Sequence, residues 1–133
     1  MLTKSITYKD FNNVERTEEF FFHLTKAELV EMQMSVHGGL DAMIKRIVNT
    51  TNEPELIKMF KELILKSYGE PSADGRRFMK IDPKDGHRLA DDFAQTEAYS
   101  VLFMELATNA DAAAKFVNGI TPDDMDLNSL PKA

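Results

Sequence analysis

Two stretches of the chain repeat the same apolar spacing, and this spacing restricts what they can fold into. In residues 40–48 and again in residues 56–64, apolar side chains recur at positions i, i+3, i+4, i+7 and i+8. That period places side chains on one face of an α-helix. Gly38-Gly39, the polar run 49–52 and Tyr68-Gly69 mark breaks around them. The sequence therefore predicts two successive amphipathic helices.

The N-terminal residues 1–24 predict a β-hairpin. Ile6 and Tyr8 alternate with small polar residues, residues 9–13 (KDFNN) are typical of a turn, and residues 14–24 are rich in strand formers. Strand alternation would place Phe22 and Leu24 on one face and Phe21 on the other. A lone hairpin is marginal in water, so we expect this one to lean on helices or on another subunit.

Further helices are indicated by caps and by apolar stripes. Thr25 and Glu28 form a capping box, which predicts a first helix that ends near His37. Beyond residue 88, Thr96 and Asn109 (or Thr108) are candidate caps. Three helical stripes are expected there: Leu89 and Phe93; Tyr99, Leu102, Phe103 and Leu106; and Ala113, Phe116, Val117 and Ile120.

Together these patterns predict an α+β fold that is mostly α. An N-terminal β-hairpin (1–24) precedes a bundle of about five helices (25–120), with an irregular loop between the third and the fourth. Within that loop, residues 77–81 could form a short strand or an ordered segment that tucks Phe78 into the core. We expect residues 1–120 to be a single globular domain and residues 121–133 to be a flexible acidic tail.

Composition narrows the classes of function. The chain has 133 residues, a formal net charge of −6 and no cysteine. The acidic balance disfavours general binding to nucleic acid, which needs a basic face. The absence of cysteine excludes disulfides, thiol catalysis and thiolate metal sites. No signal peptide and no apolar run of membrane-spanning length is recognisable, so we expect no membrane association.

No pattern indicates a catalytic, cofactor or metal site. The spacings of His23, His37 and His87 match no zinc motif. Asp91-Asp92 is typical of acidic residues that stabilise a helix start, and Asp74-Gly75 of a turn. We therefore expect no enzyme, no cofactor and no metal.

The apolar surface is the more informative candidate. Three consecutive phenylalanines cannot all face one core, so Phe21 needs a second apolar neighbour, either in this fold or in another chain. The stripe 56–64 could be core or a contact surface. Candidate residues for partner contact or self-association are Phe20, Phe21, Phe22, Leu56, Met59, Phe60 and Leu63.

Several ordered segments resemble the tail assembly chaperones of long-tailed bacteriophages. They are 39–40 (GL), 44–47 (IKRI), 60–70 (FKELILKSYGE), 74–78 (DGRRF), 95–99 (QTEAY), 103–108 (FMELAT) and 111–120 (DAAAKFVNGI). The resemblance implies a non-enzymatic protein of the host bacterial cytoplasm. Such a protein coats the tape measure protein, keeps it soluble, recruits tail tube subunits and is absent from the mature virion. We also expect a homo-oligomer that supplies many weak sites.

Two other classes remain open from the residues alone. An acidic phage-encoded regulatory or anti-defence protein could bind a host protein through its acidic surface. An enzyme is a weaker alternative, because no nucleophile–base or metal set converges in the sequence.

Overall fold

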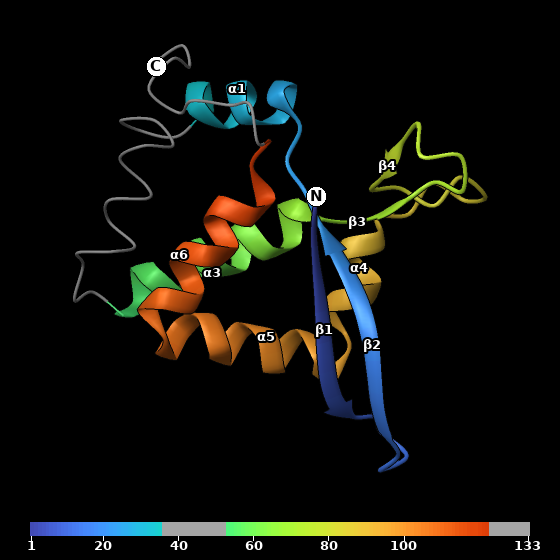
Figure 1. Ribbon diagram of the computed structural model, residues 1–133, viewed down its shortest axis with the longest axis vertical. Helices are drawn as coiled ribbons and strands as arrows, with labels where there is room; N and C mark the ends of the chain where they lie inside the picture. Colours follow the sequence, from blue (N-terminus) through green and yellow to red (C-terminus); the bar gives the residue numbers. More distant parts are fainter. Residues whose placement is uncertain (36–52, 123–133) are drawn as a thin grey trace.

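A computed structural model describes residues 1–35 and 53–122 (Figure 1). In these residues a small sheet packs against helices, and the helices account for most of the regular structure. The strands are β1 (Leu2–Lys9), β2 (Glu15–Phe22), β3 (Tyr68–Pro71) and β4 (Phe78–Met79). The helices are α1 (Lys26–Ser35), α3 (Glu53–Ser67), α4 (Leu89–Ala94), α5 (Glu97–Thr108) and α6 (Ala110–Ile120). The predicted α+β, mostly α fold is confirmed.

The predicted N-terminal hairpin is present. β1 and β2 pair antiparallel over their whole length, from Leu2 opposite Phe22 to Lys9 opposite Glu15. The turn between them is closed by Asp10, whose N–H donates to the carbonyl of Val14 at 2.9 Å. Asn13 takes the left-handed conformation with φ 63°, which asparagine tolerates better than most residues. A polar turn of this kind fixes the register of the strands that it joins.

The sheet is larger than the sequence predicted. β3 pairs with β2, and β4 pairs with β3, so the strand order is β1-β2-β3-β4. Residues 70 and 71 were expected to be irregular, whereas β4 falls where a short strand was one of two alternatives. Gly69 permits this arrangement, because a methyl group there would lie 2.6 Å from the carbonyl oxygen of Met79 and 2.6 Å from the Phe78 ring. Phe78 thus covers the sheet at Gly69.

The helices begin where the caps predicted. Thr25 Oγ1 accepts from the N–H of Glu28 at 3.2 Å, and Glu28 Oε1 accepts from the N–H of Thr25 at 2.9 Å, which completes the capping box. Thr96 caps α5 and Asn109 caps α6 through their side-chain oxygens. The predicted helix over residues 40–48 and the predicted end of the first helix near His37 lie outside the described residues.

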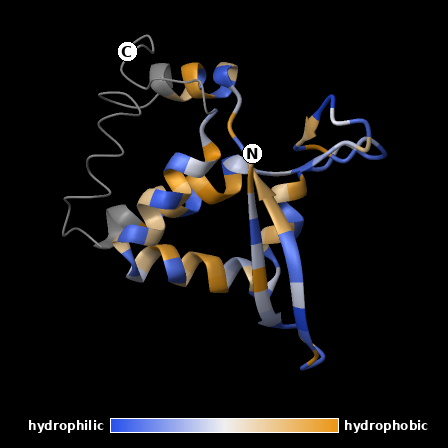
Figure 2. Cartoon of the chain, in the orientation of Figure 1, coloured by the Kyte–Doolittle hydropathy of each residue, from blue (hydrophilic) through white to orange (hydrophobic). Residues whose placement is uncertain are grey.

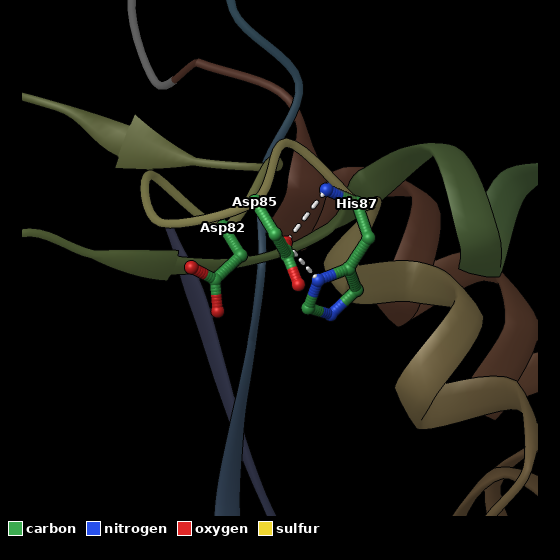
Figure 3. A group of neighbouring side chains, drawn as sticks. All are labelled: Asp82, Asp85 and His87. Carbon is green, nitrogen blue, oxygen red and sulfur yellow. Dashed lines mark hydrogen bonds and ion pairs between the residues drawn. The ribbon is translucent and has the colours of Figure 1, made fainter.

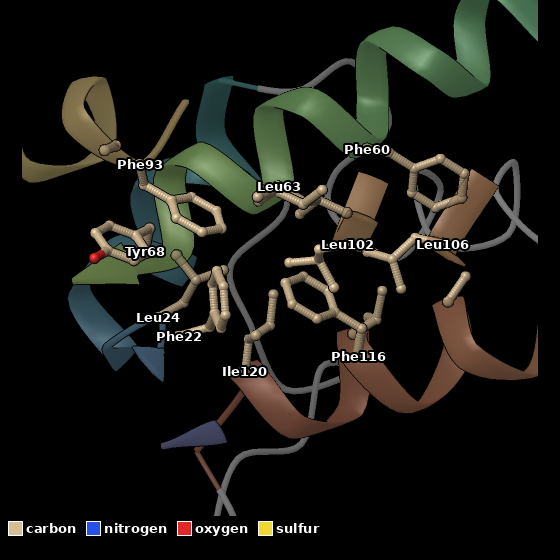
Figure 4. Packing of buried hydrophobic residues seen from close by; sticks show 14 of the residues in the cluster. Phe22, Leu24, Phe60, Leu63, Tyr68, Phe93, Leu102, Leu106, Phe116 and Ile120 are labelled. Atoms are coloured by element: carbon tan, nitrogen blue, oxygen red, sulfur yellow. The ribbon is translucent and has the colours of Figure 1, made fainter. Parts of the chain in front are cut away.

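One apolar core joins the hairpin to the helices (Figure 4). Phe22 is fully buried, with its ring edge-on to those of Tyr68, Phe93 and Phe116 at centroid distances of 5.7, 5.7 and 5.3 Å. β1 packs against α5 and α6, and the Lys4 ammonium lies 3.2 Å from a Glu105 carboxylate oxygen on α5. The hairpin therefore leans on the helices, one of the two supports that the sequence allowed.

The division into one domain (1–120) and a tail (121–133) stays a prediction, since residues 123–133 lie outside the described part. No helix of the described ranges is both long enough and apolar enough to cross a membrane.

Candidate interaction surfaces

The first surface lies where β2 and β3 part. β2 pairs with β3 only at Phe21 and Phe22, so residues 15–20 have no strand on that side among the described residues. A hollow of about 460 Å³ opens there, and we call it the β2–β3 notch. It is lined by Glu18, Glu19, Phe20, Phe21, Tyr68, Glu70 and Pro71.

The phenylalanine run divides as strand alternation predicted. Phe20 lies on the helix side, where its ring is 5.1 Å from that of Phe93 and 6.3 Å from that of Tyr8. Phe21 lies opposite Gly69 in the ladder and on the outer face of the sheet. Both side chains are half-buried, whereas Phe22 is in the core. Of the three phenylalanines, Phe20 and Phe21 line the notch and Phe22 does not.

The rim of the notch is acidic. Glu18 accepts a hydrogen bond from the Tyr8 hydroxyl, and this bond raises the pKa of Tyr8. Burial, followed by the negative charge of Glu70, raises the pKa of Tyr68 to about 12. Within the described residues neither Glu19 nor Glu70 forms an ion pair. An aromatic floor with carboxylates at its edge suits a segment that combines apolar and cationic side chains.

The stripe on α3 is core rather than surface. Met59, Phe60 and Leu63 are only 6%, 4% and 1% exposed, because this face of α3 packs against α5. Of the two alternatives left open for the stripe, the structure shows core at these three positions. Their burial, like that of Phe22, does not support their assignment to a partner surface. The side chain of Leu56 lies outside those described.

A second surface, which the sequence analysis did not identify, lies between α3 and α5. This α3–α5 groove of about 350 Å³ is lined by Ile57, Lys61, Ala94, Tyr99, Ser100, Phe103 and Met104. Ile57 and Met104 are 48% and 56% exposed. Tyr99 and Phe103 belong to one of the predicted helical stripes, and both are only half-buried. Helical spacing does not mark Ile57 or Met104, because each stands beside a buried stripe rather than in it.

Positive charge gathers next to this groove. A neighbouring hollow of about 330 Å³ shares Lys61 with it and is also lined by Lys58, Glu62, Leu65, Lys66 and Arg88. Lys58 and Lys61 form no ion pair within the described residues. An acidic protein thus carries a basic strip along the outer side of α3.

The loop before α4 brings together a histidine and three aspartates. Ligand atoms of Asp82, Asp85 and His87 lie within 4.8 Å of one another, a proximity that the histidine spacings did not predict (Figure 3). His87 Nδ1 lies 2.5 Å from Asp85 Oδ1, and Nε2 lies 2.7 Å from Asp92 Oδ2. These two contacts, with Asp92 the stronger, raise the pKa of His87 to about 9. Hydrogen bonds within the loop already use these groups, which accounts for the cluster without an ion.

Asp91 and Asp92 lie in the first turn of α4, as the sequence predicted. Asp92 additionally holds His87. The turn at Asp74-Gly75 is also present: Asp74 Oδ1 accepts from Ser72 Oγ at 2.7 Å and from the N–H of Arg76 at 3.1 Å.

A further ion pair ties the same loop to α1. The Lys80 ammonium lies 2.6 Å from Glu28 Oε2 and donates to the carbonyl of Lys66 at 2.7 Å. Burial raises the pKa of Glu28, but the hydrogen bonds from Lys80 and Thr25 outweigh this effect and the pKa stays below its usual value. Burial lowers the pKa of Lys80 despite Glu28. The capping glutamate of α1 thus also anchors the loop.

Comparison with known proteins gives one assignment. The model of a family described as phage tail assembly chaperone matches residues 1–131, almost the entire chain. No curated protein and no solved structure matched. The match agrees with the resemblance seen in the ordered segments of the sequence. The chain belongs to the phage tail assembly chaperone family.

Proposed function

We propose that this protein is a non-enzymatic chaperone that coats the tape measure protein, keeps it soluble and recruits tail tube subunits during tail assembly. It acts in the host bacterial cytoplasm as a homo-oligomer and is absent from the mature virion. Membership of the tail assembly chaperone family supports this proposal. The resemblance of the sequence segments between residues 39 and 120 to tail assembly chaperones supports it as well.

The single observation that carries the binding role is the β2–β3 notch. Phe20 and Phe21 are half-buried there in a hollow of about 460 Å³, and Glu18, Glu19 and Glu70 surround them. A helix that presents an apolar side chain flanked by lysine or arginine would bury apolar area against the rings and place its cations near the carboxylates. We therefore assign the notch as the contact for an amphipathic segment of the tape measure protein.

One notch is a small contact, and a small contact binds weakly. Many copies arranged along one long target compensate, because each neighbour raises the effective concentration of the next site. This arrangement suits a chaperone that dissociates from the tape measure protein before the tail is complete, because each weak contact can break independently of the others. Self-association is therefore part of the proposed function.

The test is co-expression with the tape measure protein of the same phage. We expect the wild-type chain to keep that protein in the soluble fraction and to co-purify with it. Phe21→Ser should reduce the recovered tape measure protein at least about tenfold, as expected for an aromatic contact residue. The free energy of unfolding should fall by about 1 kcal/mol or less, because Phe21 is only half-buried.

Val101→Ser is the matched control, since Val101 is a 42% exposed apolar residue of α5 that does not line the notch. It should bind the tape measure protein like the wild type. A large loss of stability in Phe21→Ser would place this ring in the core instead. If a host protein co-purifies and the tape measure protein does not bind, the regulatory or anti-defence alternative replaces the proposal.

A further inference from the structure

One edge of β2 is open along the part of the hairpin that projects from the core. β1 pairs with β2 from Glu15 to Phe22, whereas β3 pairs with it only at Phe21 and Phe22. In Figure 1 the hairpin extends past α5, and no described strand lies beside this part of β2 on the side away from β1. Residues 15–19 are all exposed. This part of β2 is therefore an uncovered strand edge.

The alternation of backbone groups identifies which residues face the open side. Successive residues of a strand direct their N–H and C=O groups to opposite edges. Phe21 and His23 face away from β1, because Phe21 pairs with β3 and the N–H of His23 donates to the carbonyl of Ser67 at 2.8 Å. The residues of β2 that face the same way are Glu15, Thr17 and Glu19. Their N–H and C=O groups have no hydrogen bond within the described residues.

The hairpin holds this edge extended without a further partner. Thr17 lies opposite Thr7, and their hydroxyl oxygens are 2.9 Å apart. At the turn, Asp10 Oδ1 accepts from the N–H of Val14 at 3.0 Å, and Arg16 Nε donates to Asp10 Oδ2 at 2.6 Å. A strand that is already ordered loses little conformational freedom when another strand pairs with it.

The surroundings of the open edge carry an excess of negative charge. Residues 9–19 and the lining of the β2–β3 notch hold five carboxylates and two cations. The carboxylates are Asp10, Glu15, Glu18, Glu19 and Glu70, and the cations are Lys9, which lies opposite Glu15, and Arg16, which pairs with Asp10. An excess of three negative charges remains after both cations are counted. Glu19 forms no ion pair within the described residues.

These properties specify the kind of segment that the edge can hold. Unpaired N–H and C=O groups along a strand are matched by another extended chain, whose own groups have the same spacing. The side chains of Glu15, Thr17 and Glu19 share one face of the sheet. Figure 2 shows hydrophilic colour along most of this part of β2, so an apolar helix finds no matching surface there. Lysine or arginine opposite the two glutamates would complement the charge.

We propose that the open edge of β2 at residues 15–19 binds an extended segment of a partner protein, which adds a strand to the sheet and carries basic residues opposite Glu15 and Glu19. The added strand would lie on the same side of β2 as β3, whose pairing stops at Phe21. Glu19 is the stronger anchor, because Lys9 lies opposite Glu15 across the hairpin.

A second copy is a poorer occupant of this edge. Two β2 edges paired antiparallel about Thr17 would place Glu15 of each copy opposite Glu19 of the other, and like charges in that position repel. The inference goes beyond the proposed function, because it concerns backbone pairing along β2 rather than contact with the aromatic rings of the notch.

Amide hydrogen exchange of the free protein, followed by NMR, tests whether the edge is open. The N–H groups of Thr17 and Glu19 should exchange quickly, because they face solvent. Those of Arg16 and Glu18 face β1 and should be protected. Equal protection at all four residues would contradict an open edge.

A short capped peptide in which lysine alternates with valine is the probe for strand addition. We expect it to slow exchange at Thr17 and Glu19 and to leave exchange at Arg16 and Glu18 unchanged. The matched control peptide carries glutamate in place of lysine. It should not bind, because it brings negative charge to an acidic edge.

Three changes in the protein separate backbone pairing from charge attraction. Thr17→Pro removes an N–H that faces the open side and leaves the pairing with β1 in place, as proline does on edge strands. Thr17→Val is its matched control, since both changes remove the hydroxyl group beside Thr7 but valine keeps the N–H. Glu19→Gln removes one charge and keeps the strand.

The lysine peptide should bind Thr17→Val like the wild type. Its affinity should fall about five- to tenfold in Thr17→Pro, as expected for one lost hydrogen bond. In Glu19→Gln it should fall about two- to fivefold, as expected for one cross-strand charge pair. Unfolding curves verify that each variant is folded, and the exchange pattern of the wild type with the peptide decides the question if Thr17→Pro does not fold.

The inference is wrong if the lysine peptide does not bind, or if it binds without protecting Thr17 and Glu19. It is also wrong if the glutamate peptide binds equally well, or if Thr17→Pro binds the lysine peptide like the wild type. An edge that binds neither peptide would carry its charges only as protection against unwanted strand pairing. None of these measurements involves the tape measure protein, so their outcome is independent of the proposed function.

Discussion

Replacing Phe22 by alanine tests whether the hairpin and the helices share one core. Phe22 is fully buried, and its ring meets rings that follow α3 and lie on α4 and α6. Truncation of a buried phenylalanine to alanine costs about 3–5 kcal/mol, through lost apolar burial and the cavity left behind. Three edge-on ring contacts are lost as well, each contributing about 0.5–1.5 kcal/mol in such pairs. We therefore expect a loss at the upper end, about 4–5 kcal/mol.

A loss of that size is large for a single domain, whose total stability is about 5–15 kcal/mol. At roughly 3–5 °C for each kcal/mol in a chain of this size, the melting temperature should fall by about 12–25 °C. The chain contains no tryptophan, so urea unfolding is best followed by far-ultraviolet circular dichroism. The midpoint should shift while the dependence on urea stays the same.

Phe21→Ala is the matched control, because Phe21 is the same residue type on the other face of the same strand. Its loss should be about 1 kcal/mol or less, since a half-buried ring leaves no closed cavity. If Phe22→Ala costs less than about 2 kcal/mol, or if both variants lose the same stability, the hairpin does not share the core as described. A changed urea dependence would instead indicate that the unfolding is no longer two-state.

Two further predictions concern β3 and the loop before α4. Gly69→Ala should destabilise the fold by about 1–3 kcal/mol and speed amide exchange in β4, because its methyl group would lie 2.6 Å from the backbone oxygen of Met79. Gly119→Ala is the control and should be neutral or stabilising, because its methyl group would meet only the flexible side chain of Leu2. Equal effects of the two changes would contradict the close approach at Gly69. The imidazole of His87 should titrate by NMR near its pKa of about 9, and Asp92→Asn should lower this value. Because the pKa of His87 is raised from 6.5, the stabilisation of the fold by the protonated imidazole is fully present below pH 6.5 and is lost as pH rises through about 9. A titration midpoint of His87 at or below pH 7 in the wild type would mean that its contacts with Asp85 and Asp92 do not form in solution.

Local signals predicted much of this fold. Thr25, Thr96 and Asn109 cap the helices for which the sequence nominated them. A cap depends on a side chain and on backbone groups two or three residues away, so the information lies within one turn. The same holds for the turn at residues 9–13, and strand alternation correctly separated Phe21 from Phe22.

Pairing between distant segments was not predictable in this way. Tyr68–Pro71 contains a glycine and a proline, both poor strand formers, and directly follows α3. It becomes a strand because β2 offers it a partner some forty-five residues earlier in the chain, at Phe21 and Phe22. Phe78 then completes the arrangement over Gly69. Nothing in the sequence of residues 68–71 alone predicts that they pair with β2.

The candidate surfaces show the same limit. Apolar residues at helical spacing predict a buried face, but they do not say how far the neighbouring helix extends over it. Phe60 lies under α5 and is buried, whereas Phe103 lies at the edge of the same pair of helices and is half-exposed. Phe11 stood in a segment recognised as a turn, and its exposure follows only from how far the hairpin projects.

The notch and the α3–α5 groove lie on different parts of the molecule. The notch is formed at the edge of the sheet, the hairpin tip is a turn, and the groove lies between α3 and α5. If the protein self-associates as proposed, one copy can contact a neighbour while its notch is occupied, and each contact then raises the effective concentration of the others. Avidity of this kind strengthens binding by about 10²–10⁴ without tighter single contacts. Contacts that are weak alone dissociate quickly. A coat of the kind proposed above would therefore be held firmly by many copies together and would come apart readily once its copies are displaced.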